Sequence, residues 1–149
     1  MAIIIKKTDI QSLIQLAVKE DIHTGDITSE AIFDKNNRTT AKIVSKDDGI
    51  FCGGEVINFI YEELNQDITI KSNVKDGDHI SLGKEVVHIE GITKDILSGE
   101  RIVLNFIQRM SGIATKTHSL VKLLAETNIS ILDTRKTLPG FRLLDKYAV

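Results

Sequence analysis

The residues best suited to chemistry lie near the end of the sequence, after a short apolar run at residues 129–132. Two hydroxyls and two adjacent cations follow this run: Thr134, Arg135, Lys136 and Thr137. The run is dominated by β-branched residues, so it predicts a buried strand. Ligand-binding groups of α/β folds collect at the carboxyl ends of parallel strands. Arginine offers a planar fork and lysine a compact charge, and both suit a carboxylate or phosphate. The spacing indicates an anion site, and a solvated, charged loop fits the same residues.

A second polar group lies on a segment whose other residues are mostly apolar. Arg101, Asn105 and Gln108 are spaced as i, i+4 and i+7, which places them on one face of a helix. This polar face either meets solvent, or lines a binding site or an interface between subunits. The spacing alone does not choose between these interpretations.

Other candidate sites have weaker support. Residues 20–29 contain acids and His23, but no pair has a metal-ligand spacing, so we predict no metal site there. Cys52 has no neighbouring cation or histidine and is predicted to be a core residue rather than a catalytic thiol. The pair Gly53 and Gly54 precedes a predicted helix, where it would either cradle a phosphate or make a tight turn.

Composition excludes several classes of protein. With 149 residues and 42% hydrophobic residues, the chain can bury a core and is not of the disordered class. A net charge of −2 gives no reason to expect nucleic-acid binding. The single cysteine excludes an internal disulfide. No signal peptide or membrane span is recognisable, so we expect a cytoplasmic protein with no membrane partner.

The elements predicted for the first part of the chain alternate between helices and strands. Thr8 and Gln11 form a capping-box pattern for a helix that ends near Lys19. Strands are predicted at residues 40–45, 50–52, 68–72 and 85–89, and a helix at 55–64. Asp48 and Gly49 signal a turn that would join the first two strands in a hairpin.

The second part is predicted to begin with a helix from Thr93, its N-cap, to Met110. Ser111 and Gly112 would break it before a second helix at residues 113–127, and a further helix would begin near residue 141. The predicted class is α+β: helices packed on a small, mostly antiparallel sheet, followed by the first βα element of an unfinished α/β barrel. The predicted domains are residues 1–112 and 113–149.

Four stretches of the sequence resemble the quinolinate phosphoribosyltransferase family. The first of these is the cation-rich end, Asp133-Thr134-Arg135-Lys136-Thr137-Leu138-Pro139-Gly140-Phe141-Arg142 with residues 145–149. The other three precede it in the same order as in the family: residues 20–28, 49–54 and 100–115. Residues 74–91 are also similar to the hammerhead half of biotinyl and lipoyl carrier domains. No lysine lies in the carrier pattern, so this alternative lacks its functional residue.

The resemblance implies an enzyme of NAD biosynthesis. It would join quinolinate to phosphoribosyl pyrophosphate and release nicotinate mononucleotide, carbon dioxide and pyrophosphate, with Mg2+ as cofactor. It implies that Thr134, Arg135 and Lys136 bind substrate, and that Arg101 reaches the substrate of a neighbouring subunit in a homodimer or higher homo-oligomer. The family's remaining catalytic groups are expected beyond Val149, so we expect this chain alone to be inactive. Two alternatives remain: the related family associated with molybdenum transport, and a non-catalytic dimerisation or binding fragment.

Overall fold

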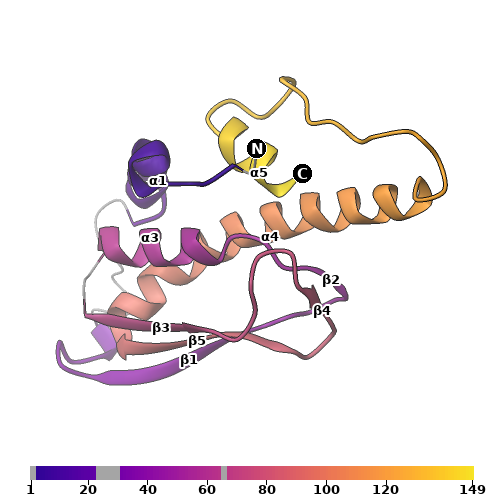
Figure 1. Cartoon of the computed structure of the whole chain (residues 1–149). Coiled ribbons are helices and arrows are strands. Elements are labelled where there is room, and N and C mark those ends of the chain that lie inside the picture. The colour runs from indigo at the N-terminus through magenta and orange to yellow at the C-terminus, as the bar shows by residue number, and fades with distance from the viewer. Residues whose placement is uncertain (1–2, 23–30, 65–66) are drawn as a thin grey trace.

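The computed structural model describes residues 3–22, 31–64 and 67–149. Its elements form three layers, which are a sheet, two helices on that sheet, and two further helices outside them (Figure 1). The helices are α1 (Lys7–Ile22), α3 (Gly54–Leu64), α4 (Thr93–Leu123) and α5 (Arg142–Ala148). The strands are β1 (Arg38–Val44), β2 (Gly49–Ile50), β3 (Ile68–Ser72), β4 (His79–Ile80) and β5 (Glu85–Ile92). This arrangement confirms the predicted α+β class.

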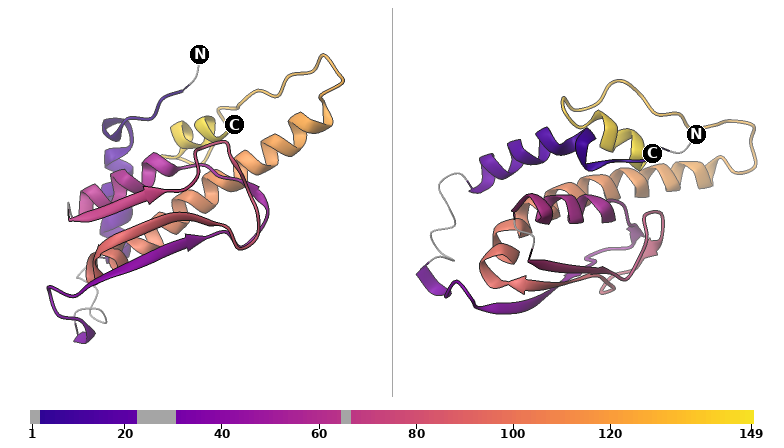
Figure 2. Two further views of the ribbon diagram at one scale, coloured as in Figure 1. Left: turned by 60° about the horizontal axis from the view of Figure 1, so that its bottom comes forward. Right: turned by 60° about the vertical axis from the view of Figure 1, so that its left-hand side comes forward.

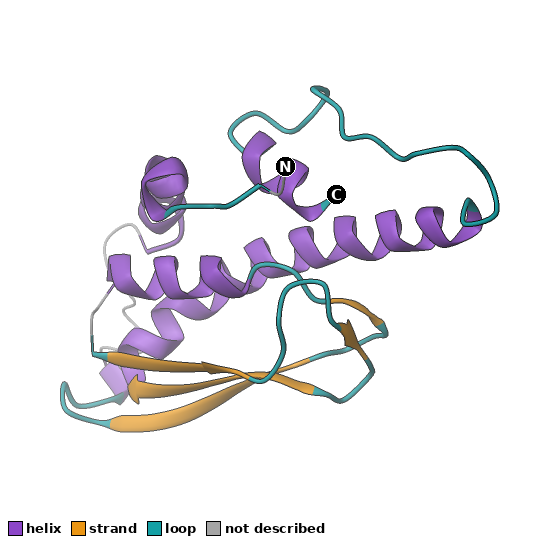
Figure 3. Ribbon diagram, viewed as in Figure 1, coloured by secondary structure: helices purple, strands orange, loops and turns teal. Residues whose placement is uncertain are grey.

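The sheet is antiparallel, and its central strand comes late in the chain. Strand β5 pairs with β1 on one side and with β3 on the other, so the strand order is β1-β5-β3. The predicted hairpin between the strand ending near Ser45 and residues 50–52 is wrong, because β2 pairs instead with β4 (Figure 3). Asp48 still makes a local turn, but its carboxylate accepts the Leu82 backbone N–H, at 2.9 Å, which ties β2 to the β4 side.

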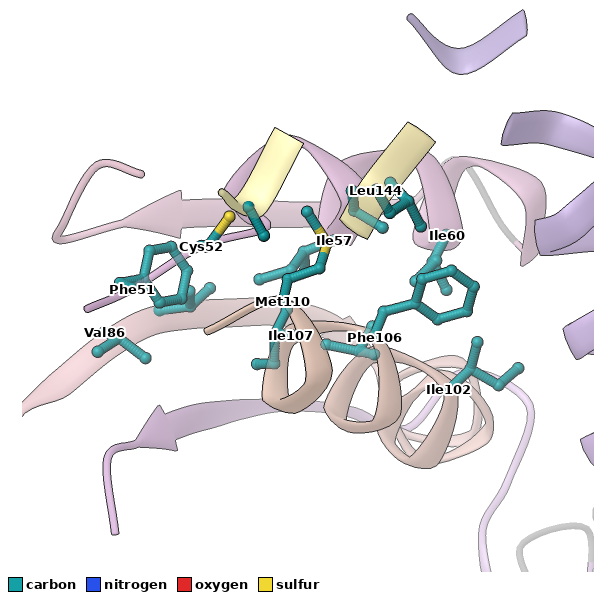
Figure 4. Close-up of a cluster of buried hydrophobic side chains, with 14 of the residues drawn as sticks. Phe51, Cys52, Ile57, Ile60, Val86, Ile102, Phe106, Ile107, Met110 and Leu144 are labelled. Carbon is teal, nitrogen blue, oxygen red and sulfur yellow. The ribbon is translucent and has the colours of Figure 1, made fainter. Parts of the chain in front are cut away.

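The core lies between the sheet and helices α3 and α4. The helix predicted at residues 55–64 is α3, and its apolar face is buried, with Val56, Ile57 and Ile60 each at most 1% exposed. Figure 4 shows Phe106, Ile107 and Met110 of α4 beside Ile57 and Ile60 of α3. Residues that recur at three- and four-residue intervals therefore form this contact, as the sequence predicts.

Helix α1 differs slightly from the prediction. It begins at Lys7 rather than after a Thr8 cap, and it extends past Lys19 to Ile22. The Asp9 carboxylate accepts the Lys6 backbone N–H, at 3.1 Å, which is the role that the predicted capping box assigned to Gln11. The rest of the loop predicted at residues 20–29, including His23, lies outside the described residues.

The predicted break at Ser111 and Gly112 is wrong, because α4 is one helix of 31 residues. The Ser111 hydroxyl accepts the Cys52 backbone N–H, at 3.0 Å, and the Thr115 hydroxyl accepts that of Ile50, at 2.9 Å. Contacts to the segment around β2 thus offset the low helix propensity of serine and glycine. Thr93 is also not the N-cap, since Ile92 occupies that position and the Thr93 side chain bonds Asn37.

The strand predicted at residues 129–132 is not formed. Residues 124–141 contain no helix or strand, and Ile129 and Leu132 are 63% and 84% exposed. A strand needs a neighbour for its backbone hydrogen bonds, and no described strand lies beside this segment. The chain instead passes back over α4 to α5 (Figure 2). Of the predicted βα element only the helix is present.

Candidate functional site

The predicted anion-binding residues lie in an exposed loop before α5. Thr134, Arg135 and Lys136 are all exposed, and the Lys136 backbone N–H donates to the Thr134 hydroxyl at 3.1 Å. Within the described part of the chain, neither the Arg135 guanidinium nor the Lys136 ammonium has a hydrogen-bond or salt-bridge partner. Two adjacent cations with no internal partner are available to an external anion.

Helix α5 holds this loop through three contacts. Lys146 forms an ion pair with Asp133. The Arg142 guanidinium donates to the Arg135 carbonyl and to the Thr137 hydroxyl, both at 3.3 Å. Gly140, with φ of 85°, makes the left-handed turn that leads into the helix. The backbone that carries the two cations is therefore attached to α5 on both sides of them.

Helix α5 is in turn fixed to α4 by a pair that the sequence analysis did not identify. Arg109 donates to both carboxylate oxygens of Asp145, at 2.8 and 2.7 Å, and Asp145 is only 7% exposed. Hydrogen bonding to Asp145 raises the pKa of Arg109, so the guanidinium group stays protonated. The same guanidinium lies over the Phe141 ring, 5.2 Å from its centroid. Leu144 has no exposed surface and joins the core near Ile57 (Figure 4).

A second attachment runs from α5 to the start of α3. The Tyr147 hydroxyl donates to one oxygen of Asp76 at 2.7 Å. The other oxygen of Asp76 accepts the backbone N–H groups of Gly53 and Gly54, at 2.9 and 2.8 Å. A carboxylate of this chain thus occupies the helix N-terminus at which the glycine pair suggested a phosphate site. Burial, and then the bond to Asp76, raises the pKa of Tyr147, which keeps its phenol protonated.

Arg101 lies elsewhere, on the exposed face of α4. Its side chain is 75% exposed and pairs with Asp21 of α1 at 3.0 Å. Asn105 and Gln108 line the same hollow, of about 420 Å³, as Arg101 and Glu100. The predicted polar face is therefore real, and it borders an open, polar depression. No hydrogen bond or ion pair between described residues joins Arg101 to the loop that carries Arg135.

Two other chemistries find little support in the described residues. Residues 3–22, 31–64 and 67–149 contain no group of three or more histidine, cysteine or acidic side chains that could hold a metal ion. Cys52 is buried, and burial raises the pKa of its thiol to about 12, so the thiolate nucleophile is not formed near neutral pH. No helix in this part of the chain is both long and apolar enough to cross a bilayer.

Comparison with known families gives two consecutive matches. Residues 26–111 match the family model of the quinolinate phosphoribosyl transferase N-terminal domain. Residues 113–149 match the model of the C-terminal domain of the same family. Helix α4 runs without interruption across the position between the two matches, so the predicted boundary after residue 112 falls within a helix.

Individual relatives agree with the family models. A Bacillus subtilis protein named as a probable nicotinate-nucleotide pyrophosphorylase (carboxylating) is 46% identical over 130 residues, which are 87% of this chain and 45% of that protein. The chloroplastic enzyme of that name from Arabidopsis thaliana is 40% identical over 144 residues, covering 95% of this chain and 40% of that protein.

A solved structure of the nicotinate-nucleotide pyrophosphorylase from Francisella tularensis matches with a TM-score of 0.92 and 36% identity. The match covers 98% of this chain and 51% of that one. The chain thus spans about half the length of the relatives it matches. The two consecutive family matches and the shared fold show that the chain belongs to the quinolinate phosphoribosyl transferase family.

Proposed function

We propose that the protein containing this chain transfers a phosphoribosyl group from phosphoribosyl pyrophosphate to quinolinate. The reaction releases pyrophosphate and carbon dioxide and forms nicotinate mononucleotide, a step of NAD biosynthesis. Relatives that carry this activity in their names support the proposal. The observation that carries it is the pair Arg135 and Lys136, which are exposed, adjacent and without a hydrogen-bond or ion-pair partner for their charged groups among the described residues.

The substrates require several positive charges. Quinolinate is a dicarboxylate, and its co-substrate carries several phosphate groups. Arg135 is suited to bind one carboxylate with two parallel hydrogen bonds, and Lys136 adds a point charge beside it. Arg101 of a neighbouring copy would supply a third cation, and its side chain, 75% exposed, is accessible to a second subunit. Thr134 retains a hydroxyl proton to donate, since its oxygen accepts the Lys136 N–H.

These cations would also assist the chemistry. Loss of carbon dioxide leaves an electron pair on the ring carbon, and nearby fixed cations stabilise that charge. The sugar carbon passes through a cation-like state, which needs carboxylates close by. Among the described residues, the carboxylate next to the two cations is that of Asp133, and it is already paired with Lys146. We therefore expect this chain alone to lack turnover.

Magnesium is part of the proposal as an ion that arrives with the pyrophosphate group. The described residues contain no group of three or more metal-ligating side chains, and magnesium ions that accompany phosphate groups usually take only one or two protein carboxylates.

We further propose that the protein is a homodimer or a higher homo-oligomer. The end of α4 and the following loop expose Leu123, Ile129 and Leu132, at 79%, 63% and 84%. Burial of these exposed apolar side chains against a second copy would stabilise such an assembly. Sedimentation equilibrium of the chain tests the proposal. A single species of 16.6 kDa at concentrations up to about 0.1 mM would contradict it.

A cytoplasmic location stays a prediction, and some relatives are named as chloroplastic or mitochondrial.

A product assay tests the proposed reaction. The protein at the full length of its relatives is incubated with quinolinate, phosphoribosyl pyrophosphate and magnesium, and nicotinate mononucleotide is measured. We expect turnover on the order of 1 per second or more. Arg135→Ala should abolish most of it, whereas Arg38→Ala, which removes an exposed arginine of β1 paired with Asp67, should not. Absence of product from the wild-type protein would contradict the proposal and favour the molybdenum-associated or non-catalytic alternatives.

A further inference from the structure

Helix α5 makes different contacts on its two sides. One side faces the body of the protein, where Leu144 is buried, Asp145 pairs with Arg109, and Tyr147 bonds Asp76. The other side carries Arg142 and Lys146, which bond the 133–137 segment. Among the described residues, no hydrogen bond or ion pair joins the segment with the two cations to the body except through this helix of 7 residues.

We propose that Asp76, through Tyr147, is a positioning residue for the anion-binding segment 133–137. The inference rests on the proposed function, because it concerns the geometry of the same cations. Asp76 lies in the turn between β3 and β4, and its hydrogen bonds among the described residues go to Gly53, Gly54 and Tyr147 rather than to the two cations. It acts at a distance by fixing the rotation of α5, and α5 sets the direction in which the loop presents its charges.

The geometry of Asp76 suits this task. One of its oxygens bonds two consecutive backbone N–H groups at the start of α3, at 2.9 and 2.8 Å, which leaves the carboxylate little freedom to turn. Its second oxygen is thereby aimed at the Tyr147 hydroxyl, 2.7 Å away. A hydrogen bond to a charged acceptor is stronger and more directional than a neutral one. The bond to Tyr147 consequently connects α5 to a rigid helix terminus rather than to a mobile side chain.

The Asp145 and Leu144 contacts do not make the Asp76 bond redundant. Leu144 and Asp145 hold the middle of α5, and a helix this short is held poorly by its own backbone bonds, so its last residues depend on contacts of their own. Tyr147 is close to the helix end and directly follows Lys146, the residue that holds Asp133. Release of Tyr147 should free this end first, and with it the first residue of the loop.

The first test uses the 149-residue chain with the substitution Tyr147→Phe, which removes a single hydroxyl group. Tyr61→Phe is the matched control, because Tyr61 is a buried tyrosine whose hydroxyl donates to the Ile96 carbonyl at 3.1 Å, away from α5. Backbone 15N relaxation measures order on the picosecond to nanosecond scale. We expect the order parameters of residues 133–137 to fall from about 0.8 to below about 0.6 in Tyr147→Phe and to stay unchanged in Tyr61→Phe.

A second variant separates transmission from a general loss of structure. Lys146→Met breaks the ion pair with Asp133 on the opposite side of α5, and it should loosen the same residues. If Lys146→Met loosens residues 133–137 while Tyr147→Phe does not, then Asp76 does not control the segment and the proposal is overturned. Equal loosening in both tyrosine variants would also overturn it, since that would be a general effect of the lost hydroxyl.

The functional readout is the steady-state kinetics of each variant, measured on a protein as long as the relatives. Tyr147→Phe is expected to raise the KM for quinolinate about tenfold, with a smaller change in kcat, while its unfolding midpoint matches that of Tyr61→Phe. Identical KM values in the two variants would contradict the positioning role. Absence of turnover in the wild-type protein would instead contradict the proposed function, and the relaxation experiment would still decide the role of Asp76.

Discussion

The packed body of the protein and the segment at residues 124–141 show opposite relations between sequence pattern and structure. In the body, the apolar stripe of α3 and the alternation of β1 lead to the expected helix and strand. In the segment, an equally apolar run at residues 129–132 forms no strand and is exposed. Both regions have suitable propensity, but only the body provides neighbouring elements that cover the apolar groups and satisfy the backbone.

The difference teaches that the site and the scaffold are specified in different ways. The scaffold is fixed by periodic burial, which is a property of each element and its immediate neighbour. The cation loop is fixed by a few polar contacts to α5 between residues 5, 7 and 13 positions apart, and α5 is fixed to the body by contacts 36 and 71 positions apart. Substitutions in the two regions should therefore change the free energy of unfolding by different amounts. Pairs of matched substitutions measure that difference.

The largest contrast is expected between two leucines. Leu144 has no exposed surface, whereas Leu132 is 84% exposed. Leu144→Ala should lower the free energy of unfolding by about 2–5 kcal/mol, because it removes buried methyl groups and leaves a cavity. Leu132→Ala should change it by less than about 0.5 kcal/mol. Urea denaturation measures both, and similar losses would mean that residues 129–132 are packed in solution.

The next contrast concerns two ion pairs. Arg109→Gln leaves the Asp145 carboxylate, which is 7% exposed, without its partner. We expect a loss of about 2–3 kcal/mol in the free energy of unfolding. Arg38→Gln breaks the exposed pair with Asp67 and should cost about 0–1 kcal/mol. Equal costs in denaturant titrations would show that α5 is not held by the Arg109 pair.

Two glycines of α4 should respond with opposite signs. A Cβ at Gly99 would lie 2.4 Å from a ring carbon of Tyr61, so Gly99→Ala should destabilise the protein by about 1–3 kcal/mol. A Cβ at Gly112 would meet nothing within 4 Å, and Gly112→Ala should stabilise a continuous helix by about 0.5–1 kcal/mol. Thermal denaturation distinguishes these cases. A destabilised Gly112→Ala would restore the break that the sequence predicted at this position.

A smaller effect should appear at alkaline pH. Burial, and then the charge of Asp76, raises the pKa of Cys52 from its ordinary value of 9.0 to about 12. Between these values the unfolded chain loses the thiol proton while the folded protein keeps it, so stability falls as the pH rises above 9. At pH 10 this amounts to about 1 kcal/mol. Cys52→Ala should show a flatter decline between pH 8 and 10. Parallel curves for the two proteins would contradict the raised pKa.

Several features were predictable because they depend on local pattern. The boundaries of β3 and the buried face of α3 follow from periodicity, and the polar face with Arg101 follows from helical spacing. The Asp76 and Arg109 contacts were not predictable, because their partners lie 71 and 36 residues away. The break at Gly112 was wrongly predicted because propensity does not include the bonds of Ser111 to Cys52. Thr134 and the cations Arg135 and Lys136 were located by their residue types and spacing, and whether they bind substrate stays a prediction.

The central claim is that cations from two regions of the sequence bind one dianionic substrate. The test uses a protein as long as the relatives, with the substitution Arg101→Ala, and measures its affinity for quinolinate by titration calorimetry. Arg38→Ala, which removes another exposed arginine, is the matched control. Loss of charge-assisted bonds should weaken binding by roughly 1.5–3 kcal/mol, or about 10- to 150-fold, in Arg101→Ala alone. Unchanged affinity in Arg101→Ala would show that Arg101 only pairs with Asp21, and it would contradict the two-region site.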